Sequence, residues 1–371
     1  MPARHLSNAP LVAASELRRV LTLWELVLYG LSIIIGAGIY VSLGAVIARA
    51  GGAAPISFLL AGGAATAAGL CYAEFASRFP EAAGAAAYVD RGFGSKRLAQ
   101  LTGTAMALAV AIAAAAIAQG AAAYLAVLIQ LPPWLIVIAL VVIFTAIAVL
   151  GVRESVVLAA VMGVIEIAGL VAVIWAGFIA APDVDLTRFL PSSESGWLGI
   201  VAGANIAFFA FIGFETLANM AEEAKDASRN VPRAIIGAIV GSTLLYVFVS
   251  VAVTLSGIED ENPLIALFSG PAASGFAALG SIAVANGVLI EIVLLARLSY
   301  GMARREQLPA LLARVHPRTR TPVIATLLSG FVILVAGLAL PFESLLVVAN
   351  ALTPSVFALV AASLWRLKRR E

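Results

Sequence analysis

The chain has 371 residues, of which 62% are hydrophobic and 12% are charged, and its net charge is +2. Soluble domains are nearer to about 45–50% apolar and about 25% charged, so the composition indicates a polytopic membrane protein rather than several soluble domains. The single cysteine, Cys71, excludes an intrachain disulfide, and the histidines, His5 and His316, lie in separate polar segments. We therefore expect no metal centre, no cofactor and no nucleic-acid partner.

Apolar segments long enough to cross a bilayer follow one another along the chain. A membrane helix needs about 20 predominantly apolar residues. The sequence contains ten such segments, at residues 22–48, 55–78, 98–129, 133–151, 155–180, 197–224, 233–256, 274–303, 322–340 and 342–366. This spacing predicts an all-α polytopic membrane protein with ten transmembrane helices.

The placement of lysine and arginine predicts the orientation. When the N-terminus is placed inside, almost all basic residues fall in cytoplasmic segments, and the outside keeps only Arg49 and Arg188. Such an excess of positive charge marks the cytoplasmic side. We expect a multi-pass protein of the cell (inner or plasma) membrane, with a cytoplasmic N-terminal segment at 1–21 and a cytoplasmic tail at 367–371.

Two of the ten segments contain glycine near their centres. The first includes residues 35–39 (Ile-Gly-Ala-Gly-Ile), and the sixth includes residues 211–215 (Phe-Ile-Gly-Phe-Glu). Each glycine weakens a helix by about 1 kcal/mol, and backbone groups freed from a helix cannot face lipid. Broken helices five segments apart predict a 5+5 inverted-topology repeat, with repeats at 22–180 and 197–366 and helices 1 and 6 broken mid-membrane.

The two breaks together suggest what they bind. The helix that starts near Tyr40 would direct free N–H groups of residues 36–39 at an anion such as a carboxylate. Carbonyl oxygens released around Phe209, Ala210 and Ile212 would accept hydrogen bonds from an ammonium group. One anion site that faces one cation site fits an α-amino acid. The alternative reading is that these glycines only allow close helix packing.

Four stretches of the sequence resemble the amino acid–polyamine–organocation (APC) superfamily of secondary transporters, which share the leucine-transporter fold. They are residues 34–40, 208–215, 222–235 and 300–309, in the order and spacing of that family. Many members have twelve spans, whereas ten are predicted here. The resemblance implies that helices 1, 2, 6 and 7 rock against the rest of the protein.

The resemblance also implies roles for individual residues. The backbone of Ile35, Gly36, Ala37 and Gly38 would bind the substrate carboxylate. Phe209, Ala210 and Ile212 would accept the amino group, and the Phe209 ring would act as an aromatic gate over the site.

Ionisable residues inside a membrane are costly and are treated as functional candidates. Glu166, in the fifth segment, is at a place where some APC members carry a lysine, and it could bind and release a coupling proton. Glu291, in the eighth segment, could hold a cationic side chain or carry the proton. Each could instead be a structural polar contact between helices. Glu215 is expected to cap a helix, and Arg297 to snorkel or to pair with Glu74.

The sequence thus predicts a secondary amino acid transporter that is not an enzyme and that works by alternating access, coupled to protons or as an exchanger. Sodium coupling is less favoured, because residues 282–298 contain no serine or threonine and the fold's usual sodium site draws hydroxyl groups from helix 8. The substrate could instead be a polyamine or another organic cation. A passive channel and a membrane-embedded enzyme are the alternatives from other classes, but neither a polar stripe nor clustered catalytic groups are found.

Overall fold

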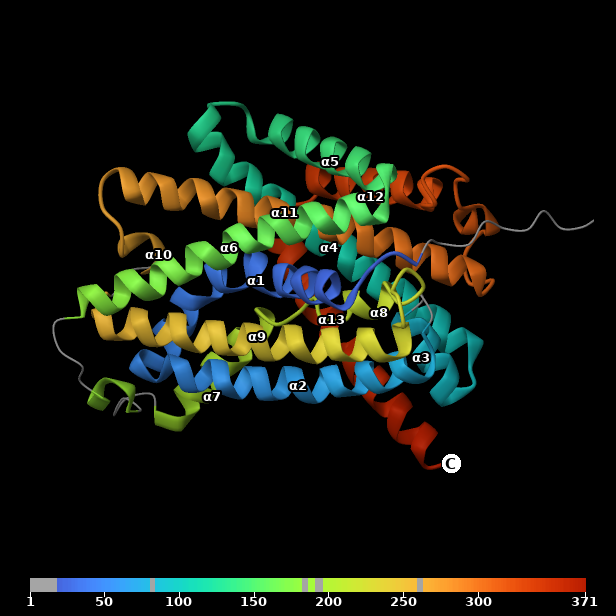
Figure 1. The fold of residues 1–371 in the computed structure, drawn as a ribbon, viewed down its shortest axis with the longest axis horizontal. Helices are drawn as coiled ribbons and strands as arrows, with labels where there is room; N and C mark the ends of the chain where they lie inside the picture. The colour runs from blue at the N-terminus through green and yellow to red at the C-terminus, as the bar shows by residue number, and fades with distance from the viewer. Residues whose placement is uncertain (1–18, 81–83, 182–185, 191–195, 259–262) are drawn as a thin grey trace, which may run out of the picture.

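The computed structural model describes residues 19–80, 84–181, 186–190, 196–258 and 263–371, and these residues are almost entirely helical. The chain forms a bundle in which the long helices run along the longest axis of the molecule (Figure 1). The α-helices are α1 (Leu23–Ala50), α2 (Ala54–Arg78), α3 (Gly84–Phe93), α4 (Lys96–Ile129), α5 (Pro133–Leu150), α6 (Val152–Ala180), α7 (Gly196–Phe209), α8 (Thr216–Asn219), α9 (Ala227–Ser256), α10 (Pro263–Ala266), α11 (Pro271–Arg304), α12 (Val323–Ala339) and α13 (Phe342–Lys368). Three short 3₁₀ helices are η1 (Gly51–Ala53), η2 (Leu186–Phe189) and η3 (Ala310–Ala313).

The ten apolar segments expected from the sequence coincide with helices α1, α2, α4, α5, α6, α7–α8, α9, α11, α12 and α13. By length and composition, 7 helical stretches of the described residues are suited to cross a membrane, and α7 and α12 are apolar but shorter. These features are those of a polytopic membrane protein. The count of ten spans, the 5+5 repeat and the domain boundaries stay predictions, and most of the expected N-terminal segment lies outside the described residues.

Segments predicted to share one side of the membrane lie at one end of the bundle. In Figure 1, α3 and the C-terminus lie at the right end, and α10 lies at the left. Ion pairs tie the right end together: Glu74 at the end of α2 contacts Lys368 of α13, and Arg305, directly after α11, contacts Asp90 of α3. The helix directions therefore agree with the predicted alternation, whereas the side of the membrane that each end faces stays a prediction.

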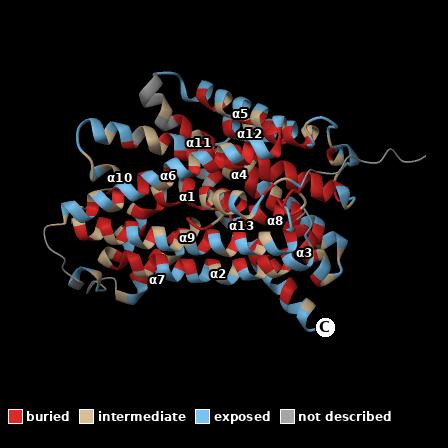
Figure 2. Cartoon of the chain, in the orientation of Figure 1, coloured by how far each residue is buried: buried red, intermediate tan, exposed pale blue. Residues whose placement is uncertain are grey.

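The contacts between helices fall into two groups, one of which contains the helices with the breaks. Helix α1 contacts α2, α7 and α9, and α2 contacts α7 and α9. Helices α4, α5, α11 and α12 contact one another, α6 touches members of both groups, and α1 also touches α11. Buried residues follow the inner faces of the bundle, while much of its outside is exposed (Figure 2). Exposed residues include large apolar side chains such as Trp134, Trp175 and Trp197. An apolar outer surface of this kind fits contact with lipid.

Candidate substrate site

The first break lies within α1. Gly36 has φ −21° and ψ −113°, which is not helical, so α1 is two helices joined across a kink at this residue. The neighbours Ile34, Ile35 and Ile39 are buried. A Cβ placed on Gly36 would lie 3.9 Å from the carbonyl oxygen of Ala283 in α11. The break expected from the sequence is therefore present in α1, with one side turned towards α11; the side chain of Ala37 is not among the described ones.

The second break separates α7 from α8. After Phe209 the N–H groups of Ala210, Phe211 and Ile212 each bond to the carbonyl oxygen three residues earlier, at 3.0–3.2 Å, which is a tighter turn than an α-helix. Gly213 has φ 122°, a backbone conformation that residues with a side chain rarely adopt. The helical hydrogen-bond pattern is thus interrupted at the expected place.

Glu215 stabilises the second break. Its Oε2 accepts a hydrogen bond of 2.9 Å from the backbone N–H of Gly213, and the side chain is buried. The carboxylate satisfies a donor that the interrupted helix leaves without a backbone partner. The capping role expected for Glu215 is not found: the residue stands at the start of α8, but its side chain makes no capping hydrogen bond there and instead accepts from Gly213, which lies before it.

The two breaks touch each other. A Cβ placed on Gly38 would lie 2.9 Å from both the Cα and the carbonyl oxygen of Ala210. A real Cβ atom would not fit at this distance. Because glycine has no Cβ, Gly38 lets the backbone of α1 approach the backbone of the α7–α8 turn directly. Residues far apart in the sequence are in this way brought into contact.

Tyr246 of α9 joins the two breaks, and the sequence analysis did not single it out. Its hydroxyl donates to the carbonyl oxygen of Ile34 in α1 and lies 3.1 Å from that of Ala210. The side chain is fully buried, and its ring packs edge-on against Phe211 with a centroid distance of 5.2 Å. A tyrosine within an apolar segment looks like a core residue, so no pattern in the sequence pointed to this contact.

We expect Tyr246→Phe to lower the free energy of unfolding by about 1–3 kcal/mol, because the buried carbonyl oxygen of Ile34 loses its donor. The ring contacts remain, so the effect reports the hydroxyl alone. Thermal and denaturant unfolding of the purified protein in detergent would measure it. The matched control is Tyr300→Phe, whose hydroxyl makes a longer bond of 3.4 Å to Glu222 in a part-buried place. Equal losses in both variants would contradict a special role for Tyr246.

The carbonyl oxygens expected to accept the amino group at the second break already have different hydrogen-bond partners. The Phe209 oxygen accepts from the N–H of Ile212 at 3.2 Å, and the Ala210 oxygen faces Tyr246. Phe209 and Ile212 are half-buried and Ala210 is buried. A carbonyl oxygen has two lone pairs, so each can accept a further hydrogen bond.

Glu166 of α6 lies in a buried polar network beside the first break. Its Oε1 accepts a hydrogen bond of 3.0 Å from Nδ2 of Asn286 in α11, and the same nitrogen donates to Ser32 Oγ of α1 at 2.6 Å. Ser32 in turn donates to the carbonyl oxygen of Ala159. Within the described residues, Glu166 Oε2 and Asn286 Oδ1 have no hydrogen-bond partner. Three helices thus meet at a carboxyl group with one unused oxygen.

Glu291 of α11 lies near Glu215 and near Tyr29 of α1. Its side chain is half-buried, and its Oε2 has no hydrogen-bond partner among the residues that the structure describes. Glu215 and Tyr29 are close enough to interact with it electrostatically. The structure therefore places Glu291 beside the second break rather than beside Glu166.

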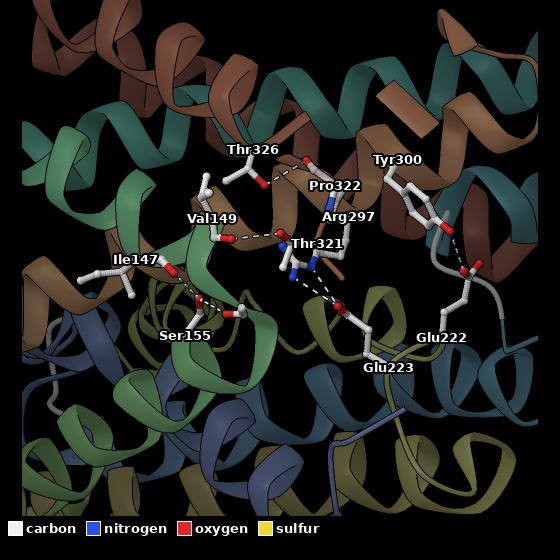
Figure 3. Close-up of polar contacts among 11 residues, drawn as sticks. Ile147, Val149, Ser155, Glu222, Glu223, Arg297, Tyr300, Thr321, Pro322 and Thr326 are labelled. Carbon is white, nitrogen blue, oxygen red and sulfur yellow. Dashed lines mark hydrogen bonds and ion pairs between the residues drawn. The ribbon is translucent and has the colours of Figure 1, made fainter. Parts of the chain in front are cut away.

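The expected pairing of Arg297 with Glu74 is wrong. Arg297 contacts Glu223 instead, with Nε–Oε2 and Nη2–Oε1 distances of 3.2 Å, and both side chains are 0% exposed (Figure 3). Glu74 binds Arg78 and Lys368 at the end of the bundle. The reason is that a fully buried guanidinium needs an acidic partner at its own depth in the bundle. Glu223 is held at that depth because its carbonyl oxygen accepts hydrogen bonds from the N–H groups of Val20 and Leu21.

Two cavities among the described residues lie away from the breaks. One, of about 790 Å³, lies between the end of α1, η2 and the end of α9; the other, of about 900 Å³, lies between α2, α9 and α13. Within the same residues, no group of three or more His, Cys, Asp or Glu side chains could hold a metal ion.

Comparisons with known proteins agree with these features. A family model described as "Amino acid permease" matches residues 21–371. The chain is 30% identical to the methylthioribose transporter of Bacillus subtilis (strain 168), over 96% of this chain and 83% of that protein. It is 28% identical to the branched-chain amino acid permease BcaP of the same strain, over 99% of this chain and 86% of that protein.

A plant relative, the chloroplastic cationic amino acid transporter 9 of Arabidopsis thaliana, is 30% identical over 82% of this chain, which spans 58% of the relative's length. The relatives are permeases and transporters, not enzymes, and the resemblance to the APC superfamily noted in the sequence is confirmed. The chain belongs to the amino acid permease family.

Proposed function

We propose that this protein carries amino acids across the cell membrane by alternating access, with both termini in the cytoplasm. The observation that carries the proposal is the direct contact between the two breaks at Gly38 and Ala210. A site built from two interrupted helices is where secondary transporters of this architecture hold their substrates. The family and the printed names of two of the reported relatives, BcaP and the cationic amino acid transporter 9, support an amino acid as the cargo.

The substrate would lie between the breaks as a zwitterion. Backbone N–H groups of Ile35, Gly36, Ala37 and Gly38 would bind its carboxylate. The carbonyl oxygens of Phe209, Ala210 and Ile212 would bind its ammonium group. Phe209, which is half-buried at the end of α7, would close over it as a gate.

Two packed groups of helices support a rocking motion. Helices α1, α2, α7–α8 and α9 would move against α4, α5, α11 and α12, as each group has its own internal contacts. The 5+5 inverted repeat, 22–180 and 197–366, would let the two arrangements be related by symmetry, so that the site opens to either side in turn.

Glu166 is the proposed coupling residue, and a second mode, exchange of one amino acid for another, stays open. We expect wild-type uptake into proteoliposomes to rise several-fold when an inward proton gradient is imposed, and Glu166→Gln to remove that response while binding persists. Glutamine keeps an acceptor for Asn286 Nδ2 but cannot exchange a proton. Uptake of labelled amino acid with and without the gradient measures the effect. Equal responses in wild type and variant would contradict coupling through Glu166.

A thermal-shift screen of the purified protein against the twenty amino acids and common polyamines would identify the substrate class. A ligand that binds only the folded state raises the free energy of unfolding, by about 2.7 kcal/mol when its concentration is one hundred times Kd. The melting temperature rises as a result. Glu291 would add an ion pair for a cationic side chain, so lysine, arginine or ornithine should lose their advantage in Glu291→Gln. Saturable and stereoselective uptake of a hit would separate a transporter from a passive channel.

A further inference from the structure

The cavity between α2, α9 and α13 is lined by two kinds of residue at different depths. In this cavity, the wall further from the end of the bundle is apolar, with Leu70, Ile236 and Leu364. Its outer wall, about one helical turn nearer the end of the bundle, is polar and includes Arg233 and Lys368. Each of the three helices changes from apolar to polar in the same direction, so the cavity has an apolar floor and a charged rim.

The rim has more positive than negative charge. Arg233 and Lys368 line it together with one carboxylate, Glu74, which leaves a net charge of +1. Both oxygens of Glu74 are already used, at 2.7 Å from Arg78 and at 2.7 Å from Lys368. Within the described residues Arg233 has no ion-pair partner, and its side chain is exposed. A cation is therefore left available at the mouth of the cavity.

The open side of the cavity faces the surroundings of the bundle. Leu70 is 54% exposed although it lines an apolar wall. In a membrane protein such a surface meets acyl chains, and a basic group one turn further out meets the level of the headgroups. The volume of about 900 Å³ is in the range of sites for small organic ligands.

We propose that this cavity binds one anionic phospholipid, with its phosphate at Arg233 and Lys368 and part of an acyl chain against Leu70, Ile236 and Leu364. Arg233 supplies the free charge. Lys368 can turn from Glu74 to the phosphate, because Arg78 keeps its Nη2 contact with that carboxylate while its Nη1 binds Glu371. The lipid would join α2 and α9 of one group of helices to α13. The occupancy of this site is independent of which substrate the protein carries.

Native mass spectrometry of the purified protein tests the site directly. Phosphatidylglycerol and phosphatidylcholine with identical acyl chains would be titrated into the wild type, Arg233→Gln/Lys368→Gln and the control Arg314→Gln/Arg318→Gln. The control removes two exposed arginines of the 304–320 loop, at the same end but away from the cavity. We expect the first bound phosphatidylglycerol to weaken about tenfold in the cavity variant and less than about twofold in the control.

A second variant tests the apolar part without changing charge. Cys71, the only cysteine of the chain, lines the cavity beside Leu70. Cys71→Trp should fill the space and weaken phosphatidylglycerol binding about fivefold, with melting in phosphatidylcholine unchanged.

Three results would overturn the proposal. Equal weakening in the cavity variant and the loop control would assign the effect to general surface charge. Wild-type binding by Cys71→Trp would place the headgroup on the surface outside the cavity. A lipid-free dimer that dissociates in the cavity variants would assign the cavity to a second copy of the chain.

Discussion

Gly38→Ala is expected to lower substrate uptake by about one hundredfold, the largest functional effect of any single methyl group in the chain. The added Cβ would lie 2.9 Å from the Cα and the carbonyl oxygen of Ala210, and both are backbone atoms that cannot rotate away. The α7–α8 turn must move from α1, which changes the spacing of the groups proposed to bind carboxylate and ammonium. Small displacements of binding groups have effects of this size. Initial rates of uptake into proteoliposomes and ligand-induced thermal shifts would measure it.

The matched control is Gly237→Ala in α9. Its Cβ would lie 3.7 Å from Cγ2 of Val27, which is ordinary contact, so uptake should stay within about twofold of wild type. Alanine also favours a helix over glycine by about 1 kcal/mol, so neither variant has to lose helix stability. Normal uptake by Gly38→Ala would show that the close approach serves packing only, and would remove the main support for the proposed substrate site.

The positions of the helices could be predicted from the sequence because each helix depends on the residues within its own segment. Ten apolar segments gave the positions of the long helices, and glycine at residues 36 and 213 gave the two interruptions, one of which has the positive φ that glycine permits. Arginine and lysine placement gave the alternation that puts α3 and the C-terminus at a common end. All of these follow from composition over a few helical turns.

The contacts between helices could not be predicted in the same way. Tyr246 reaches Ile34 across 212 positions of the sequence, and Glu166 reaches Asn286 across 120. No periodicity specifies such pairs, because they depend on how α6, α9 and α11 are rotated about their axes. Asn286 joins α11 to α1 and α6, and these partners had to come from the structure.

The error at Arg297 has the same origin. Glu74 and Arg297 were expected on the same side of the membrane, so they were plausible partners by depth alone. The structure instead brings in Glu223, from the chain segment between α8 and α9, whose backbone is held by the residues just before α1. A partner on an irregular segment has no helical register, and its position cannot be read from spacing.

Removal of the Glu223 carboxylate is expected to have the largest effect on stability. Glu223→Gln should lower the free energy of unfolding by about 3–5 kcal/mol, because it leaves the guanidinium of Arg297 buried without its counter-charge. Both side chains are 0% exposed and are joined by two hydrogen bonds of 3.2 Å. Thermal and denaturant unfolding in detergent would measure the loss. Arg297→Met should cost a similar amount, since it strands the carboxylate instead.

Two further variants distinguish the effect of the buried Glu223–Arg297 ion pair from the effect of the packing around it. Glu222→Gln, at the neighbouring residue (Figure 3), removes a pair with Arg304. The side chain of Arg304 is 51% exposed, and exposed pairs contribute only about 0–1 kcal/mol. The double variant Glu223→Leu/Arg297→Met should recover most of the loss, because a buried pair replaced by apolar groups of similar volume is often neutral. If the double variant were instead as unstable as the sum of the single ones, the cost would come from lost packing. The link between the segment before α1 and α11 would then depend on shape and not on charge.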